Sequence, residues 1–107
     1  PPLAARIADM ALTNPQLRYL RGLAHDLNPV IMVGNKGVTD ALVAELEVAL
    51  DHHELVKVRI SAGDRDARDA VGAELIARTK SEKVQRVGNV LSLYRRNADK
   101  PKLELPR

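Results

Sequence analysis

Apolar residues recur at helical spacing in three segments of the chain, which predicts three amphipathic helices. The first spans about 13–25 and opens with a capping-box pattern between Thr13 and Gln16. The other two are expected at about 39–53 and 64–79. The positions expected to face the core are, in chain order, Leu17, Leu20, Ala24, Leu42, Leu46, Ala49, Leu50, Ala67, Val71 and Leu75.

Two apolar segments between these helices predict strands of different kinds. Val30–Val33 is a continuous apolar run between a proline and a glycine, a pattern typical of a strand covered on both faces. We therefore expect it at the centre of the sheet. Residues 55–60 alternate instead, with aliphatic side chains on one face and Lys57 and Arg59 on the other. This second strand is expected to turn a basic face toward solvent.

A β-hairpin is expected near the end of the chain. Two strands, 84–87 and 90–94, are separated by Gly88-Asn89, a two-residue connection that favours a tight turn. The predicted order is helix-strand-helix-strand-helix-strand-strand. Strand-helix-strand units require parallel pairing and a hairpin is antiparallel, so we expect an α/β fold with a mixed four-stranded sheet packed with three helices. The charged face of the second strand indicates helices mainly on the opposite side of the sheet.

Length and composition limit the classes of protein. The 107 residues, 45% hydrophobic and 29% charged, are enough for one folded domain and too few for two. We expect that domain at 12–96, with 1–11 as an N-terminal extension, native or added, and 97–107 as a polar, loosely attached tail. No apolar run approaches the ~18 residues of a membrane span, so the expected location is cytoplasmic.

Residue usage also excludes several kinds of site. The chain has no cysteine, which excludes disulfides and thiolate zinc sites. Aromatic residues are only 2% of the chain, which weighs against RNA readers that stack bases on aromatic side chains.

The first candidate site is the loop Gly34-Asn35-Lys36-Gly37, between a strand and a helix. Two glycines let the backbone approach a ligand closely, and Lys36 adds a cation, which together suit a phosphate group. KH modules clamp an RNA backbone with a loop of this kind. The alternative is a plain strand-to-helix turn, and Asp40 would compete with an anion. The Walker A pattern is absent, so hydrolysis of nucleoside triphosphates is not expected.

The histidines are the second candidate. His52 and His53 are adjacent on a helix, so their side chains diverge and share a metal ion poorly, while histidine near a helix C-terminus is favoured by the helix dipole. His25 stands alone. A hydrolytic grouping with Ser61 lacks any pattern that fixes its geometry. We therefore expect no enzyme, no metal, no cofactor and no small-molecule substrate.

Basic residues are the third candidate. The formal net charge is only +3, but the cations are not spread evenly. Acidic and basic residues nearly balance on the third predicted helix, and the cations concentrate in the other elements. Arg68 on that helix is accordingly expected outside any contact zone. The alternative is a solvated surface of mixed charge. The concentrated set is Arg18, Arg21, Lys36, Lys57, Arg59, Lys80, Lys83, Arg86, Arg95 and Arg96.

Two long motifs then give a specific resemblance. LRGLAHDLNPVIMVGNKGVTDALVAELEVALDHHELVKVRI at 20–60 and VGNVLSLYRR at 87–96 resemble the CRM domain, named for chloroplast RNA splicing and ribosome maturation, in its stand-alone bacterial YhbY-like form. The resemblance implies a fold similar to the C-terminal domain of bacterial translation initiation factor three. It also implies RNA binding without catalysis. Bacterial members associate with precursors of the large ribosomal subunit, and plant members assist group II intron splicing.

The resemblance also assigns residues to the RNA surface. The GxxG loop of the family corresponds to 34–37, and its ELxKV strand corresponds to 54–58. Relatives often carry lysine where this chain has Asn28 and Asn89, which lowers the local positive potential. We expect a monomer that binds ribosomal RNA of the large-subunit precursor; the alternative is a protein-interaction module that docks on a ribosomal protein or self-associates through an open sheet face. The expected RNA contacts are Gly34, Asn35, Lys36, Gly37, Arg18, Arg21, Lys57 and Arg59.

Overall fold

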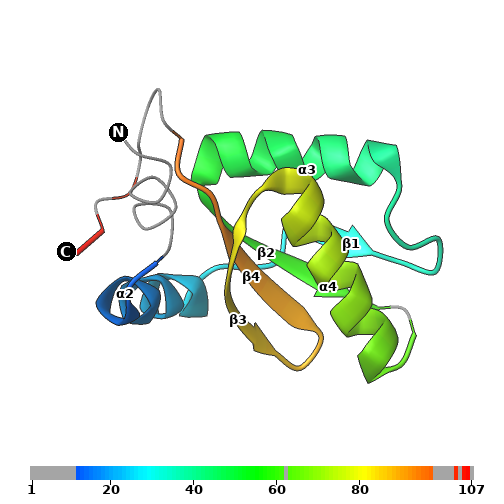
Figure 1. Cartoon of the computed structure of the whole chain (residues 1–107), viewed down its shortest axis with the longest axis horizontal. Helices are drawn as coiled ribbons and strands as arrows, with labels where there is room; N and C mark the ends of the chain where they lie inside the picture. The colour runs from blue at the N-terminus through cyan, green and yellow to red at the C-terminus, as the bar shows by residue number, and fades with distance from the viewer. Residues whose placement is uncertain (1–11, 62, 98–102, 104, 107) are drawn as a thin grey trace, which may run out of the picture.

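The computed structural model describes residues 12–61, 63–97, 103 and 105–106 (Figure 1). The expected N-terminal extension lies outside them. The elements follow the predicted order and are α2 (Asn14–His25), β1 (Ile31–Val33), α3 (Asp40–His53), β2 (Leu55–Ile60), α4 (Arg65–Thr79), β3 (Glu82–Val87) and β4 (Val90–Tyr94). Three helices and a mixed four-stranded sheet confirm the predicted α/β class.

Side-chain caps fix the start of each helix. The Thr13 side chain accepts from the backbone N–H of Gln16, whose own side chain accepts from the N–H of Thr13, so the predicted capping box is present. Thr39 and Asp64 each accept from the N–H three residues further on, which opens α3 and α4 where the sequence placed them. Ala67, expected to face the core, is exposed on the first turn of α4.

The strand order is β1-β2-β4-β3, which overturns the expected central position of Val30–Val33. β1 pairs in parallel with β2 alone, because the antiparallel strand β4 occupies the other side of β2. The apolar run is therefore at an edge of the sheet, and it is buried on one face only. Ile31 and Val33 are buried, whereas Val30 is 54% exposed and Met32 is 63% exposed. A short apolar run is compatible with either place, and the pairing of β4 with β2 decided between them.

The predicted hairpin is confirmed. Gly88 has a φ of +60° and begins a two-residue turn that brings Val87 opposite Val90. The carbonyl of Asn89 in the same turn accepts from the N–H of Ile60 at 2.7 Å, which fastens the hairpin to the end of β2.

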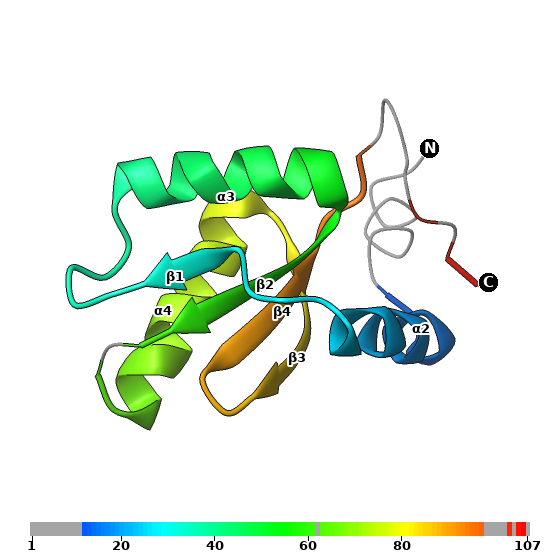
Figure 2. The same ribbon diagram turned by 180° about the vertical axis from the view of Figure 1, so that it is seen from behind.

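Two apolar cores lie on opposite faces of the sheet (Figure 1, Figure 2). On one face α3 and α4 cover a core built from Ile31, Val33, Leu46, Leu50, Val56, Val58, Ile60, Leu75, Leu91 and Leu93. On the other face α2 covers only the part of the sheet near the start of β2, with a smaller core of Leu20, Ala24, Leu55, Val84 and Tyr94. The rest of that face carries Arg59 and stays open, as the alternation in 55–60 predicted.

Arg95 joins three elements just after β4. Its guanidinium donates to the carboxylates of Glu47 at 2.6 Å and Asp51 at 2.8 Å, both on α3, and to the carbonyl of Thr79 at the end of α4, at 2.9 Å. The Arg95 side chain is only 20% exposed. It therefore acts as a structural clamp rather than as part of a basic surface.

The described part of the C-terminal tail is fastened to the domain, unlike the loose attachment expected. Glu54 is fully buried where α3 ends, and its carboxylate accepts from the N–H groups of Asn97 at 2.6 Å and Leu103 at 2.7 Å. Leu103 and Leu105 pack against the smaller core under α2. Backbone N–H groups hydrogen-bonded to a buried carboxylate satisfy the charge that burial would otherwise penalise.

The clamp predicts a stability effect that separates Arg95 from its neighbour. Arg95→Met should lower the free energy of unfolding by about 2 kcal/mol, because it removes charge-assisted hydrogen bonds to two helices. Arg96→Met removes the same charge at an exposed position and should change it by less than about 0.5 kcal/mol. Urea unfolding followed by circular dichroism measures both. Equal effects of the two substitutions would contradict the clamp.

Candidate nucleic-acid interface

The GxxG segment forms a tight, exposed turn between β1 and α3. The N–H of Gly37 donates to the carbonyl of Gly34 at 3.0 Å, and Gly37 has a φ of +69°. A side-chain carbon built at Gly34 would meet nothing within 4 Å. Lys36 is exposed and bonds to no other residue in the described part of the chain. The turn projects from the end of β1 (Figure 2). It therefore presents accessible backbone and, among the described residues, an unpaired cation.

Two further loops meet the GxxG turn at the carboxyl ends of β1 and β2. The N–H of Ser61 donates to the carbonyl of Val33 at 2.9 Å, and the N–H of Ile60 donates to that of Asn89 at 2.7 Å. The strand ends, the start of the β2–α4 loop and the hairpin turn thus lie side by side. Arg59 is exposed on the open face here, opposite Met32 in the parallel register.

Asp40 was expected to compete with an anion at the GxxG loop, and its charge is engaged elsewhere. Arg78 of α4 donates to the Asp40 carboxylate at 2.6 Å. That hydrogen bond raises the pKa of Arg78 above its usual value, so the Arg78 guanidinium stays charged. Arg78 offsets the one acidic group in the first turn of α3.

Lys57 has a structural role at the end of α2. Its ammonium group donates to the carbonyls of Ala24 at 2.9 Å and Leu27 at 3.0 Å. The last carbonyls of a helix lack intrahelical partners and carry partial negative charge, so a lysine here stabilises the helix end. Lys57 is consequently committed to holding α2 against β2.

Arg18 and Arg21 lie on α2, at the opposite end of the sheet from the GxxG turn (Figure 2). α2 packs over Leu55 at the start of β2, whereas the turn follows the end of the parallel strand β1. The structure therefore divides the predicted set. The GxxG residues and Arg59 share one end, while Arg18, Arg21 and Lys57 belong to the other.

Sequence reasoning named Lys83 and Arg86 in the cationic set but did not join them to Arg65 and Arg68 of α4. Arg68, expected outside the contact zone, lines a groove between α4 and the hairpin with Arg65, Lys83 and Arg86. Helical spacing could have placed Arg65 and Arg68 on one face of α4. Lys83 and Arg86 lie beside that face because of the position of β3 in the strand order, which the sequence did not predict.

The residues considered for catalysis or metal binding are not assembled into a site. His52 and His53 precede β2 and Ser61 follows it, so the six-residue strand separates them by about 20 Å. Across 12–61, 63–97, 103 and 105–106, no group of three histidine or acidic side chains is placed to hold a metal ion. In those same ranges no helix is both long and apolar enough to cross a bilayer.

Comparison with known proteins decides the family. The model of the CRS1 / YhbY (CRM) domain matches residues 12–95. This chain belongs to the CRM domain family. Similar proteins include an "RNA-binding protein" of Haemophilus influenzae, 43% identical over 96 residues, which are 90% of this chain and 96% of that one. A "Probable RNA-binding protein" of Pseudomonas aeruginosa is 42% identical over 82% of this CRM chain and 85% of its own length.

A solved structure agrees with the CRM assignment. The solution structure of a hypothetical protein of Staphylococcus aureus, described with RNA binding as its suspected role, has a TM-score of 0.76 and 32% identity. The match covers 90% of this chain and all of that one. The names of these relatives state RNA binding. They agree with the prediction that this CRM chain is an RNA-binding protein and not an enzyme.

Substitution of the two basic residues of β2, Lys57 and Arg59, should affect the stability of the protein differently. Lys57→Met should lower the free energy of unfolding by about 1–2 kcal/mol, because the carbonyls at the end of α2 lose their cationic donor. Arg59→Met, on the open face of the same strand, should stay within about 0.5 kcal/mol of the unaltered protein. Urea unfolding of both variants is the measurement, and a neutral Lys57→Met would remove its capping role.

Proposed function

We propose that this CRM protein binds structured RNA at the carboxyl ends of β1 and β2, mainly through phosphate contacts. The observation that carries the proposal is the GxxG turn, where the backbone at Gly34 is open to solvent and Lys36 is unpaired among the described residues. Arg59 extends the cationic surface beside it. The names of the similar proteins support RNA as the partner.

The chemistry available at this end favours the RNA backbone over the bases. A glycine turn lets a phosphate approach main-chain N–H groups, and lysine adds a point charge. The chain has no phenylalanine or tryptophan and only two tyrosines, Tyr19 and Tyr94, of which Tyr94 is buried. Little base stacking is therefore available, and affinity should depend on phosphate neutralisation and on the shape of the RNA.

The target we propose is ribosomal RNA in a precursor of the large subunit, which is what the CRM resemblance implies. In this role the protein acts in the cytoplasm as a monomeric assembly factor, without a cofactor. Arg18 and Arg21 on α2 could contact only a part of the RNA that extends along the open sheet face, because they lie at the far end of the sheet.

A second candidate function rests on the apolar edge of the sheet. Leu27 is 40% exposed, Val30 54% and Met32 63%, and an open groove lined by Leu27, Val30 and Leu55 lies beside them. Exposed apolar groups at an unpaired strand edge suit docking of a protein. A ribosomal protein or a second copy of the chain would then be the partner.

Neutralising the loop lysine should separate binding from folding. Lys36→Gln should weaken binding of a fluorescently labelled RNA hairpin several-fold and reduce the slope of log affinity against log salt by about one, because one phosphate contact is lost. Lys80 belongs to the cationic set indicated by the sequence, but the structure places it as the C-cap of α4, at the end of that helix away from the β2–α4 loop. Lys80→Gln makes the same charge change there and should bind like the unaltered protein. Fluorescence anisotropy across a salt series measures both, and a salt-independent affinity would favour the protein partner.

The glycine at the start of the turn allows a test of backbone approach. Gly34→Val should leave thermal stability nearly unchanged, because its φ is not positive and its surroundings are open, yet it should weaken binding of the same RNA hairpin several-fold. Gly37 is less suitable, since its φ of +69° strains any side chain. A folded Gly34→Val protein with undiminished affinity would exclude close approach of RNA to this backbone.

The proposed target is tested in cells by crosslinking and sequencing of bound RNA. Reads should concentrate in large-subunit ribosomal RNA and its unprocessed flanks. The Lys36→Gln protein, expressed at the same level, should recover fewer of them. Enrichment of other transcripts with no ribosomal signal would overturn the target while leaving RNA binding in place.

A further inference from the structure

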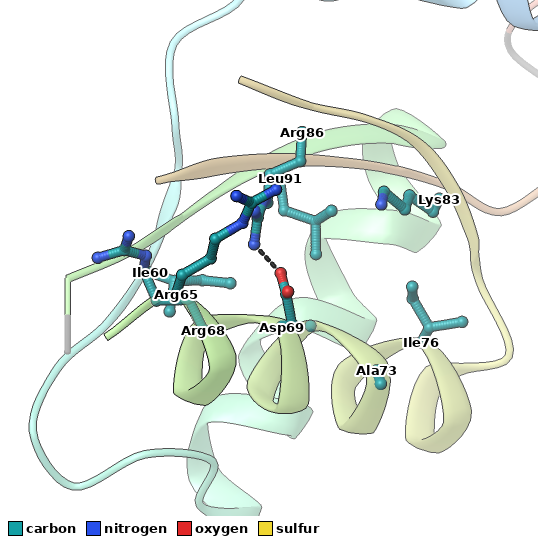
Figure 3. A pocket seen from close by; sticks show the side chains of 10 residues that line it. Ile60, Arg65, Arg68, Asp69, Ala73, Ile76, Lys83, Arg86 and Leu91 are labelled. Carbon is teal, nitrogen blue, oxygen red and sulfur yellow. Dashed lines mark hydrogen bonds and ion pairs between the residues drawn. The ribbon is translucent and has the colours of Figure 1, made fainter. Parts of the chain in front are cut away.

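A second cationic site lies in the groove between α4 and the β3–β4 hairpin, which has a volume of about 300 Å³. In Figure 3, Arg65 and Arg68 extend from α4, Arg86 of β3 reaches Asp69 beside them, and Lys83 of β3 lies nearer the Ile76 end of the groove. Asp69 is the one carboxylate among the lining residues, and it pairs with Arg86. The lining residues include four cations and one anion, so their formal net charge is +3, the same as that of the entire chain.

The charges of α4 are sorted between its faces. Arg65, Arg68 and Asp69 share the groove face with Gly72, at the spacing that aligns residues along a helix. The other acidic residues of this helix, Asp66 and Glu74, do not line the groove. The near-balance of charge along α4 therefore hides a basic face.

Two of the three guanidinium groups in the groove, those of Arg68 and Arg86, are held in place by the protein itself. Arg68 donates through Nη1 to the carbonyl of Gly63 at 3.3 Å, while its Nε is buried and meets no acceptor in the described part of the chain. Arg86 is held by Asp69, and its side chain is only 19% exposed. A buried donor without an acceptor is unfavourable, so a ligand oxygen that reaches Nε would relieve it.

We propose that this groove is a phosphate-binding site. Guanidinium groups present several N–H donors in a plane, which matches the oxygens of a phosphate. Ile60 and Leu91 are apolar residues that line the groove, and Gly72 lets α4 pack closely against β4, since a side-chain carbon there would lie 3.2 Å from Leu91. Apolar walls strengthen the field of the cations toward the ligand.

Resting on the proposed function, the groove takes a second phosphate of the same RNA. It begins at Arg65, just after the loop in which Ser61 is hydrogen-bonded to Val33 at the end of β1. The GxxG turn follows that same strand end. An RNA backbone that contacts Lys36 can therefore continue past the β2–α4 loop to Arg65 and Arg68.

The groove is tested directly with inorganic phosphate at constant ionic strength, followed by the ¹H–¹⁵N signal of Arg68 Nε–H in NMR spectra. The signal should move and saturate in the unaltered protein and in Lys36→Gln. Arg65→Gln should require several-fold more phosphate for the same change. A signal that does not move would overturn the proposal.

Binding of the labelled RNA hairpin then tests the role in RNA recognition. Arg65→Gln and Arg68→Gln should each weaken binding several-fold and lower the salt slope by about one, whereas Lys80→Gln should have no effect. If Lys36→Gln weakens binding and both groove variants bind normally, the second RNA contact is overturned and the proposed function stands. If the unaltered protein binds no RNA, the proposed function fails, and the phosphate titration alone decides whether the groove is a phosphate site.

Discussion

The alternation of side chains along β2 is the constraint on which the other elements depend. Val56, Val58 and Ile60 point to the core under α3 and α4, while Leu55 points to the smaller core under α2. β2 also pairs on both edges, in parallel with β1 and antiparallel with β4. A shift of its register by one residue would exchange the two faces and bury Arg59. β2 therefore places β1 and β4 directly, and β3 follows through its pairing with β4.

This arrangement separates stability from recognition along the length of the sheet. Near the amino end of β2, Lys57 holds α2 against the sheet. The buried carboxylate of Glu54 holds the C-terminal tail at the same end. At the carboxyl end, loops meet that are fastened by backbone hydrogen bonds. Lys36 on one of these loops and Arg59 on β2 are exposed there. Lys36 and Arg59 at that end are exposed and do not hold elements of the domain together.

Identical charges consequently have different roles. Arg95 joins α3, α4 and β4, and Lys57 caps α2, so neither contributes a free cation to the surface. Arg68 is on a helix whose charges nearly balance, yet it faces a groove that is strongly basic. What distinguishes these residues is the acceptor within reach of each side chain, and that depends on elements distant in the sequence.

The sequence by itself determined the helices, the hairpin and the alternation of 55–60, because caps, turn residues and hydrophobic periodicity act over a few residues. Its two long motifs carried the resemblance to the CRM family. Only the tertiary structure decided that Val30–Val33 lies at an edge, that Arg18 and Arg21 are far from Lys36, and that the cations of α4 and β3 form one groove. These features depend on β4 pairing beside β2. Strand order is a competition between long-range pairings of similar local pattern, and the packing of the whole domain settles it.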